Sequence, residues 1–225
     1  MMKGNKMTTT KAYKGLPMEG MIASWYARTT LKDLKRHKLM AKQLVEKIPA
    51  NGTVLEIAPG PGYFCIELAQ LGNYEIIGLD ISKSFVEIAR RNAVEAGLEI
   101  DFRQGNASAM PFKDNTFDFT FCQAAFKNFS EPVKAIAEMY RVLRPKGMAV
   151  IVDLRCDASA EEIEKEIKGM GLGPVNEMMV RWTFKQMLLK SAYSVADMES
   201  MIAQTPFGKG RIDVSGVGFQ VWLEK

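Results

Sequence analysis

A short stretch of the sequence, VLEIAPGPGYF (residues 54–64), places an acid and then a run of glycine and proline directly after an apolar segment. Glycine lets the backbone turn sharply and approach a ligand closely, which is the use we expect for Gly60 and Gly62. Pro59 and Pro61 stiffen that turn, and Pro61 suits the first position of a following helix. The free N–H groups and the dipole of such a helix attract negative groups. The pattern therefore predicts a loop that binds a polar ligand through its main chain.

A second acid stands about twenty residues further along the chain. Asp80 ends the next apolar run, EIIGLD, and Glu56 lies just before the glycine loop. Ligands of an open parallel sheet bind beyond the carboxyl ends of its strands, where an acid at the position of Asp80 can accept hydrogen bonds from a ribose. The alternative for both acids is a strand-end carboxylate that is satisfied by nearby backbone N–H groups.

Two nucleotide-binding loops compete for this pattern. The phosphate-binding loop ends in Gly-Lys-Ser/Thr and is excluded, because no lysine follows these glycines. A dinucleotide site is closer, because Gly60, Gly62 and Asp80 have suitable spacing. However, Cys65 occupies the third glycine position of that fingerprint, and the fingerprint does not ask for an acid at Glu56.

Several motifs in order resemble those of the class I methyltransferases that use S-adenosylmethionine. LEIAPGPG resembles the first motif, with Ala58 in place of its first glycine, and GLDIS and GNASAMPF resemble the second and third. FDFTFCQAAFKNF and EPVKAIAEMYRVLRPKGMAVIVDL are similar to the fourth strand, the next helix and the fifth strand, with Lys146 in place of a glycine. The resemblance covers roughly residues 54–154.

This resemblance implies a cofactor and the residues that bind it. Asp80 would hold the ribose hydroxyls and Ile81 would lie against adenine. Asn106 stands where an aspartate usually contacts the adenine amino group, and an amide can both accept from and donate to that ring. The positions expected to bind S-adenosylmethionine are Glu56, Ala58, Pro59, Gly60, Gly62, Asp80, Ile81, Asn106, Ala107, Cys122 and Gln123.

The implied reaction is an in-line methyl transfer, in which alignment of the acceptor supplies most of the rate. A base is needed only if the acceptor carries a proton at its working pH. The candidate bases are Tyr26 and His37, which is the only histidine. His37 shares a helical apolar stripe with Leu34 and Ala41, so a packing role is the favoured alternative.

The candidate substrate contacts come from three parts of the chain. They are Trp25 and Tyr26 in the N-terminal segment, Phe126 and Lys127 after the fourth strand, and Met178 and Trp182 in a helical insert expected at residues 155–191. In relatives the first segment often folds over the cofactor and the insert diversifies the substrate pocket. Methionine and aromatic side chains suit an apolar acceptor. Ordinary packing, and ordinary solvation of Lys127, are the alternatives.

Apolar strand-like runs alternate with helical patterns from Thr53 onward. The expected strands lie at 53–57, 75–80, 99–104, 117–122 and 148–154, and the expected helices at 61–70, 82–96 and 131–143. This alternation predicts βαβ units. Two last runs, at 211–215 and 218–225, flank a glycine-bearing turn and predict an antiparallel hairpin. The expected fold is α/β: a doubly wound, Rossmann-like sheet of seven mostly parallel strands with that hairpin at its end.

The chain has 225 residues, which fits one domain over 1–225 with a helical segment at 1–48. Its three cysteines, Cys65, Cys122 and Cys156, are widely spaced, so neither a disulfide framework nor a metal site is indicated. A reducing cytoplasm fits best. The sequence has no signal-peptide core and no apolar run that would span a membrane.

Positive charge is concentrated at the start of the chain. Residues 1–50 hold eleven Lys and Arg against three Asp and Glu, although the net charge of the whole chain is only +4. We interpret this excess as a solvated helix face, because the lysines are not interleaved with aromatic residues. The prediction is a methyltransferase that acts on a small molecule. The alternatives are an RNA or DNA methyltransferase that uses the basic segment, and a non-catalytic S-adenosylmethionine-binding protein.

Overall fold

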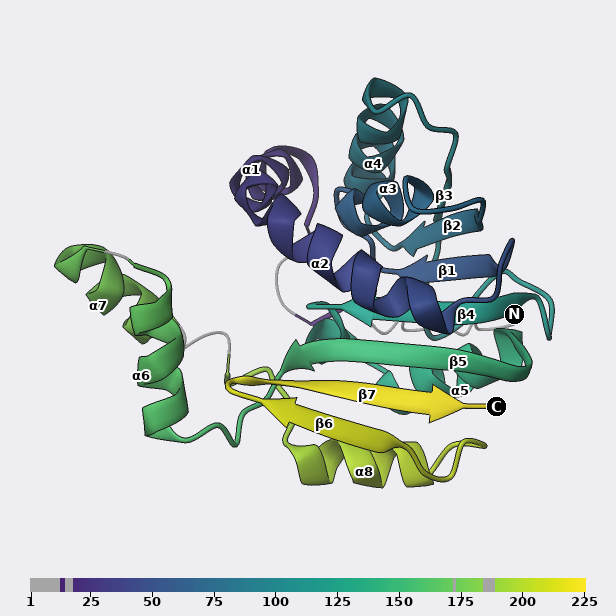
Figure 1. The fold of residues 1–225 in the computed structure, drawn as a ribbon. Helices are drawn as coiled ribbons and strands as arrows, with labels where there is room; N and C mark the ends of the chain where they lie inside the picture. The colour runs from purple at the N-terminus through teal and green to yellow at the C-terminus, as the bar shows by residue number, and fades with distance from the viewer. Residues whose placement is uncertain (1–12, 15–17, 172, 184–188) are drawn as a thin grey trace, which may run out of the picture.

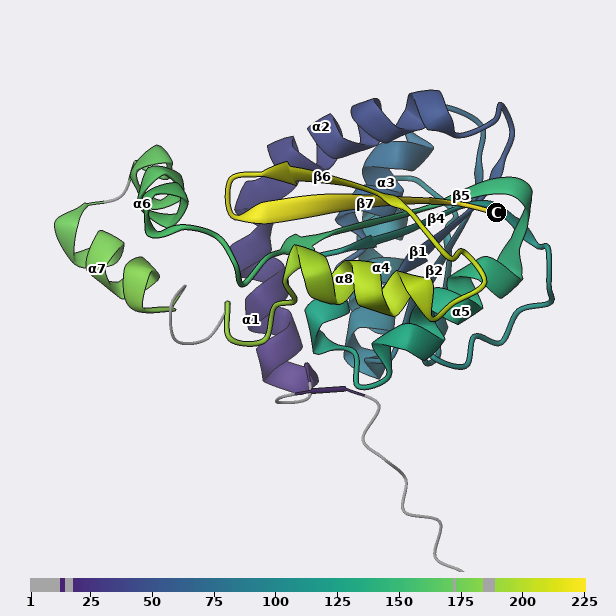
Figure 2. The same ribbon diagram turned by 90° about the horizontal axis from the view of Figure 1, so that it is seen from below.

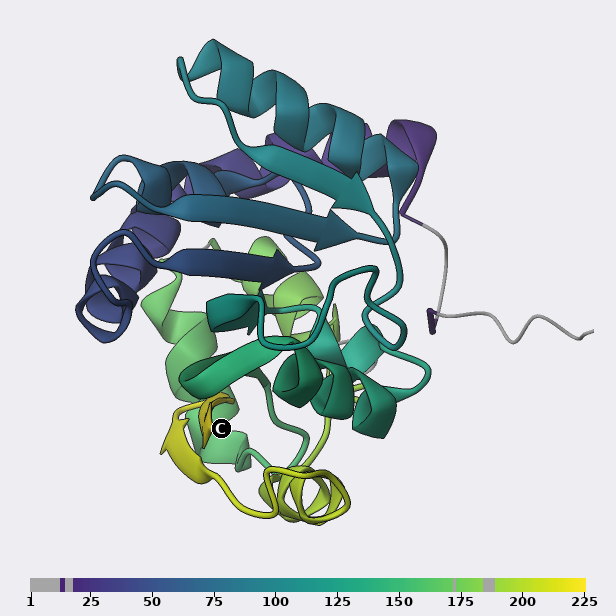
Figure 3. The ribbon, with the colours of Figure 1, turned by 90° about the vertical axis from the view of Figure 1, so that its right-hand side faces the viewer.

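A computed structural model describes residues 13–14, 18–171, 173–183 and 189–225. Its centre is a seven-stranded sheet with the order β3-β2-β1-β4-β5-β7-β6 (Figure 1). The first five strands are parallel to one another, and β7 runs antiparallel to both β5 and β6. The strands are β1 (Thr53–Ile57), β2 (Glu75–Asp80), β3 (Asp101–Gln104), β4 (Phe117–Gln123), β5 (Leu143–Leu154), β6 (Arg211–Ser215) and β7 (Gly218–Glu224). Figure 3 shows them in this spatial order, from β3 down to the yellow hairpin.

Helices cover both faces of the sheet, because both faces of these strands are apolar. One layer holds α2 (Leu34–Leu44), α3 (Tyr63–Ala69) and α4 (Lys83–Glu95), and the other holds α5 (Pro132–Val142) and α8 (Val195–Ala203). Figure 2 shows α2 on one side of the sheet and α5 and α8 on the other. The short helices η1 (Leu31–Asp33), η2 (Val45–Lys47) and η3 (Phe126–Asn128) lie in connections. The expected doubly wound sheet and its terminal hairpin are confirmed.

Two further helical pieces lie outside these layers. α1 (Gly20–Thr30) packs on α4 through Ala23 and Ala27 rather than on the sheet. α6 (Ala160–Gly169) and α7 (Pro174–Thr183) form an arm that extends away from the sheet (Figures 1 and 2). The expected segment at 1–48 and the insert at 155–191 contain these helices, although 1–12, 15–17, 172 and 184–188 lie outside the described residues.

Three expected boundaries were wrong by two residues or more, and one of them is the strand expected at 99–104, which begins at Asp101. The helix expected from Pro61 begins at Tyr63, because Gly62 adopts a left-handed conformation (φ 79°) and therefore cannot continue a right-handed helix. The strand expected from Met148 begins at Leu143, since the turn around Lys146 (φ 69°) is absorbed into β5 as an irregularity beside β4. By contrast, Ser82 caps α4 as predicted, its hydroxyl oxygen accepting a hydrogen bond from the backbone N–H of Phe85 at 3.1 Å.

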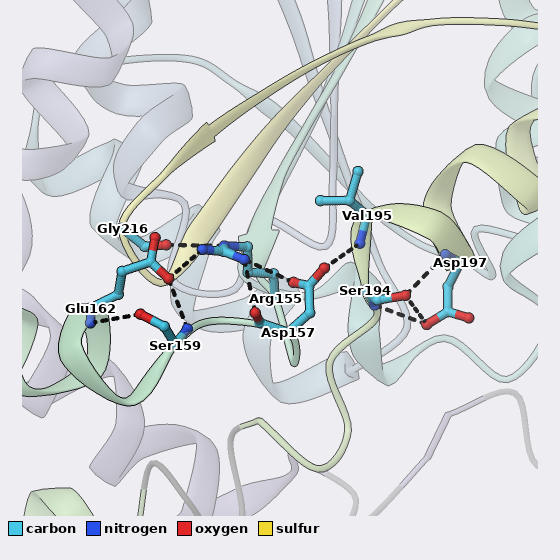
Figure 4. A network of polar contacts seen from close by, with 8 residues as sticks. All are labelled: Arg155, Asp157, Ser159, Glu162, Ser194, Val195, Asp197 and Gly216. Atoms are coloured by element: carbon cyan, nitrogen blue, oxygen red, sulfur yellow. Dashed lines mark hydrogen bonds and ion pairs between the residues drawn. The ribbon is translucent and has the colours of Figure 1, made fainter.

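A polar network fastens the arm to the sheet (Figure 4). The buried guanidinium of Arg155 donates to the carbonyl oxygen of Gly216 in the β6–β7 turn at 3.0 Å, to Asp157 and to Glu162. Glu162 forms a capping box with Ser159 at the start of α6. The carboxylate of Asp157 accepts from the backbone N–H of Val195, the first residue of α8, at 3.3 Å. Arg155 therefore joins both ends of the insert to the hairpin.

Candidate functional site

The loop from Ala58 to Gly62 lies where β1 ends, between β2 and β4. Successive connections leave β1 toward opposite sides at this point, which is where open parallel sheets bind ligands. Ala58, Gly60 and Gly62 all have left-handed backbone conformations, with φ values of 56°, 54° and 79°. The loop therefore winds tightly before α3 begins, as the sequence predicts.

The two glycines of the loop have different surroundings. A Cβ added to Gly60 would meet no atom within 4 Å, so that face of the loop is open to a ligand. A Cβ added to Gly62 would lie 2.8 Å from the ring of Phe102 and 3.0 Å from Ala89. Gly62 is thus required for packing α3 against β3 and α4. Gly60 leaves an open space at the loop from Ala58 to Gly62, and we call this open loop the cradle.

Asp80 joins the end of β2 to this cradle. Its buried carboxylate accepts from the backbone N–H of Gly60 at 3.0 Å and from that of Ser82 at 2.8 Å. Burial raises the pKa of Asp80 to about 6, although both hydrogen bonds favour the charged form. Each oxygen retains a further lone pair, so the carboxylate can still accept from the hydroxyl groups of a sugar.

Glu56 lies beneath the loop and is held by Cys65 in α3. The Oε2 atom accepts from the backbone N–H of Cys65 at 3.1 Å and from its thiol at 2.8 Å. Burial raises the pKa of Glu56 to about 7, and burial also raises the pKa of the Cys65 thiol. Sequence reasoning treated Cys65 only as a departure from a fingerprint. Cys65 is the third residue of α3, and no local pattern in the sequence indicates that it faces Glu56.

The residues expected around adenine lie after β2 and β3. Ile81 has an exposed side chain, and its carbonyl oxygen accepts from the Gln104 side chain at 3.1 Å. Asn106 turns its Oδ1 toward the backbone N–H of Ser108 at 2.9 Å, and Ala107 packs at the margin of the core. The Asn106 oxygen thus already shapes its own turn, which leaves the amide nitrogen as the better group for a ligand.

The segment after β4 contributes an unsatisfied polar atom. Cys122 and Phe126 are fully buried in the core. Among the described residues, the buried Oε1 atom of Gln123 has no hydrogen-bond partner. Buried polar atoms in native proteins almost always have a hydrogen-bond partner. The unpaired Oε1 atom of Gln123 could therefore accept a hydrogen bond from a ligand.

The site thus combines the open loop at Gly60, the carboxylate of Asp80 beside it, and the exposed side chain of Ile81, which could lie against a flat ring. A family profile with the description "Methyltransferase domain" matches residues 55–151, which run from β1 into β5. The match contains the cradle, Asp80 and the post-β4 segment.

Residues 55–151 thus match a methyltransferase domain, and the fold is that of the class I S-adenosylmethionine-dependent methyltransferases.

Curated relatives agree with this family. The chain is 34% identical over 122 residues to a demethylmenaquinone methyltransferase of Thermus thermophilus, which covers 54% of each protein. It is 37% identical over 107 residues to the Deinococcus radiodurans protein of the same name, covering 47% of this chain and 44% of the relative. The chain thus spans about half the length of these curated relatives.

Solved structures share the class I fold. A Methanococcus maripaludis protein, provisionally assigned as an S-adenosylmethionine-dependent methyltransferase, has a TM-score of 0.76 at 20% identity, covering 96% of this chain and 97% of that one. A methyltransferase from Aquifex aeolicus has a TM-score of 0.67 at 21% identity, covering 87% and 95%.

In this class I structure, the N-terminal segment is fastened beside the cradle. Glu19 accepts from the backbone N–H groups of Lys83 and Ser84, both at 3.0 Å, and so caps α4 from a distant part of the chain. The Ser82 hydroxyl donates to the carbonyl oxygen of Met18 at 2.6 Å. These bonds bring α1 to the helix that follows Asp80.

The structure also places the two candidate bases. Tyr26 packs edge-on against Phe85, with 5.7 Å between ring centroids, and His37 lies 5.9 Å from the ring of Tyr63. Tyr13 of the N-terminal segment is close enough to Tyr26 and Asp80 for both to add to the rise in its pKa, which is mainly due to burial. Tyr26 therefore lies against α4, the helix that follows Asp80.

Lys127, which the sequence offers as a substrate contact after the fourth strand, is paired with Asp153. Its ammonium donates to Asp153 at 2.8 Å and to the carbonyl oxygen of Ala124 at 2.9 Å, and its backbone N–H donates to the same carboxylate at 3.0 Å. Both side chains are buried. This pair fixes the segment that carries Gln123 and Phe126.

The remaining candidates point into solvent. Trp25 on α1 is 60% exposed, and Met178 and Trp182 on the arm are 63% and 61% exposed. These side chains are therefore not packed core, which was the alternative to a role in binding.

Proposed function

We propose that this protein transfers a methyl group from S-adenosylmethionine to a small-molecule acceptor. The arrangement at Asp80 carries the proposal: its carboxylate is hydrogen-bonded to the amide of Gly60, whose Cα faces open space. In this arrangement the Asp80 carboxylate can bind a ribose. The main chain at Gly60 can then approach the rest of the ligand closely.

The residues present fit the whole cofactor. Asp80 would accept from the ribose hydroxyls, Ile81 would cover one face of adenine, and the Asn106 amide nitrogen would donate to a ring nitrogen. Glu56 places negative charge beneath the loop, which favours a ligand with a positive amino group and sulfonium. The orphaned Gln123 oxygen would accept from an N–H or O–H group at the methyl end.

S-adenosylmethionine supplies a methyl group on positively charged sulfur, which leaves as a neutral thioether. The chain then has to align the acceptor and exclude water, because alignment alone can contribute ~7–11 kcal/mol. The Lys127–Asp153 pair holds the segment that faces this space. For an acceptor that carries a proton, we propose Tyr26 rather than His37 as the base, because Tyr26 packs against Phe85 of α4, the helix that follows Asp80.

We further propose that the acceptor is apolar and related to a quinol. Support comes from the relatives named demethylmenaquinone methyltransferase. The exposed methionine and tryptophan side chains of α7 agree with it, since they could cover an apolar molecule. The cytoplasm remains the proposed compartment. Within the described part of the chain, no helix is long and apolar enough to cross a bilayer.

Calorimetry with S-adenosylmethionine, its demethylated product and a nicotinamide cofactor tests the proposal. Asp80→Asn should weaken binding of the first two by about 1–3 kcal/mol, because a charge-assisted hydrogen bond to the ribose is lost. Asp101→Asn, which changes an exposed acid on β3, is the matched control. Tight binding of the nicotinamide cofactor alone would reverse the proposal. Transfer of a labelled methyl group to a demethylated quinol then tests the acceptor.

A further inference from the structure

The N-terminal helices carry large apolar side chains that the fold does not bury. On α1 and η1, Met21 is 88% exposed, Trp25 is 60% exposed and Leu31 is also exposed. Met21 and Trp25 lie on one face of α1, opposite to Ala23 and Ala27, which are buried against α4. The apolar face is therefore turned outward by the same packing that fixes the helix.

The same N-terminal helices also carry exposed cations. Arg28 lies three residues after Trp25 and therefore on the same face of α1. Lys32 and Lys35 follow Leu31 in exposed positions. Among the described side chains, none of these three cations is paired with a carboxylate. Residues 20–44 hold six Lys and Arg against one acid, whereas the chain after residue 50 has an excess of acids. The positive potential is thus concentrated on these helices.

Exposed apolar side chains beside exposed cations favour one kind of binding partner. Tryptophan, methionine and leucine beside lysine and arginine are the composition of helices that lie in a membrane interface, where apolar groups enter the acyl boundary and cations meet anionic headgroups. A nucleic acid would satisfy the cations but would leave Met21 and Leu31 in water. A surface without the cations would not favour an anionic bilayer.

We propose that the α1 surface, formed by Met21, Trp25, Arg28, Leu31, Lys32 and Lys35, docks on an anionic phospholipid bilayer. α1 flanks the edge of the sheet at which the parallel strands end (Figures 1 and 2), so docking brings the cradle close to the membrane. The anchoring of α1 through Glu19 and Ser82 means that the surface is formed before binding. This inference concerns lipid binding alone and does not depend on methyl transfer.

Vesicle co-sedimentation of the full chain tests the surface. Vesicles of phosphatidylcholine with about one third phosphatidylglycerol should bind the protein, pure phosphatidylcholine should bind it at least about tenfold more weakly, and added salt should reduce the difference. Met21→Ser/Trp25→Ser and Arg28→Glu/Lys32→Glu/Lys35→Glu should each lower binding by about tenfold or more.

Matched controls separate this surface from general properties of the protein. Val94→Ser removes an exposed apolar side chain from α4, and Lys113→Glu/Lys190→Glu/Lys209→Glu changes the same charge elsewhere. Both should leave binding within about twofold of the wild type. Equal loss in the controls, or full binding by the α1 variants, would refute the proposal.

Tryptophan fluorescence reports directly on the contact. The chain has three tryptophans, so Trp182→Phe/Trp222→Phe leaves Trp25 as the single reporter. Its emission should shift to the blue on addition of anionic vesicles and should be quenched by brominated lipids. An unchanged spectrum, combined with a shift on addition of an RNA oligonucleotide, would overturn the membrane assignment in favour of nucleic acid. Loss of a dimer in light scattering of Met21→Ser/Trp25→Ser would instead assign the surface to a second copy.

Discussion

The loop after β1 contains three left-handed residues within five positions, and one of them is not glycine. Ala58 adopts a φ of 56°, which costs an L-residue about 1–2 kcal/mol relative to the right-handed region. Its backbone N–H donates to the carbonyl oxygen of Leu79 in β2 at 2.8 Å, so the strained residue is held by the neighbouring strand. The surrounding sheet therefore determines the loop conformation more than the glycines do.

The two glycines of this loop should respond differently to the same substitution. Gly62→Ala should destabilise the fold by about 2–4 kcal/mol, because a left-handed alanine would also collide with Phe102 and Ala89. Gly60→Ala should cost only the strain, about 1–2 kcal/mol, but should weaken cofactor binding because its methyl group enters the cradle. Urea unfolding and calorimetry measure the two effects. Equal losses of stability would contradict the assignment of the two roles.

Glu56 should make the stability of the ligand-free protein depend on pH. Its pKa is about 7 in the folded state because of burial, against an ordinary value of 4.5 in the unfolded chain. Between these values the folded state binds a proton that the unfolded state has lost, so the free energy of unfolding falls as pH rises from about 4.5 to 7. A shift of this size corresponds to roughly 3 kcal/mol, and Asp80 adds to it in the same direction.

Glu56→Gln should flatten this pH dependence and stabilise the ligand-free protein above pH 7, while weakening cofactor binding. Urea unfolding from pH 4.5 to 8 measures the slope, with Glu46→Gln as the control on an exposed acid. A slope in Glu56→Gln equal to that of the wild type would show that Glu56 does not carry the effect.

Between elements, a buried polar link joins the segment after β4 to the end of β5. Lys127 makes three contacts there, with Asp153 at 2.8 Å and 3.0 Å and with the carbonyl oxygen of Ala124 at 2.9 Å. Ala124 is left-handed (φ 55°), and this link holds it in that strained conformation. The pair therefore positions the segment from which Gln123 would contact the ligand.

Breaking this pair from one side should be costly. Lys127→Met should destabilise the protein by about 3–5 kcal/mol, because the Asp153 carboxylate would stay buried without its cation. The double variant Lys127→Met/Asp153→Asn should lose less than the sum of the single changes. Lys134→Met, which breaks an exposed pair with Glu131, should cost less than about 1 kcal/mol. Additive losses in a urea-unfolding cycle would show that the two groups are not coupled.

The molecule as a whole is a sheet with two attachments, the N-terminal helices and the arm, both of which lie beside the carboxyl ends of the parallel strands (Figures 1 and 2). α1 is attached through α4, and the arm through the Arg155 network (Figure 4). A small apolar cluster around Ile163, Ile167 and Leu189 also contains Val217 of the β6–β7 turn and packs against Leu154 of β5. The arm is thus attached to the hairpin end of the sheet by this cluster and by the Arg155 network.

Arg155→Met should loosen the arm without unfolding the sheet. It removes the bonds that connect the β6–β7 turn with the start of α6, so hydrogen exchange should rise in α6 and at the beginning of α8 but not in β1 or β4. Arg211→Met, which changes an exposed arginine on β6, is the control and should leave the exchange of α6 unchanged. Faster exchange throughout the sheet would mean that Arg155 supports the whole fold instead.

Local chemistry made much of this architecture predictable. The buried strands, the Ser82 cap of α4 and the turn between β6 and β7 each depend on residues close together in the chain, so the pattern of apolar and capping residues is sufficient. The same holds for Glu56, Gly60 and Asp80, because parallel strands bring their carboxyl ends to one edge.

Tertiary packing alone decided the contacts between distant residues. The bond from Cys65 to Glu56, the Glu19 cap on α4 and the Lys127–Asp153 pair join segments whose approach no local pattern encodes. Packing also divided the roles of Gly60 and Gly62, since only the position of Phe102 shows which glycine has no room for a side chain. Sequence periodicity thus determined the elements and the acids at their ends. The neighbours of each side chain were set by burial of the two sheet faces.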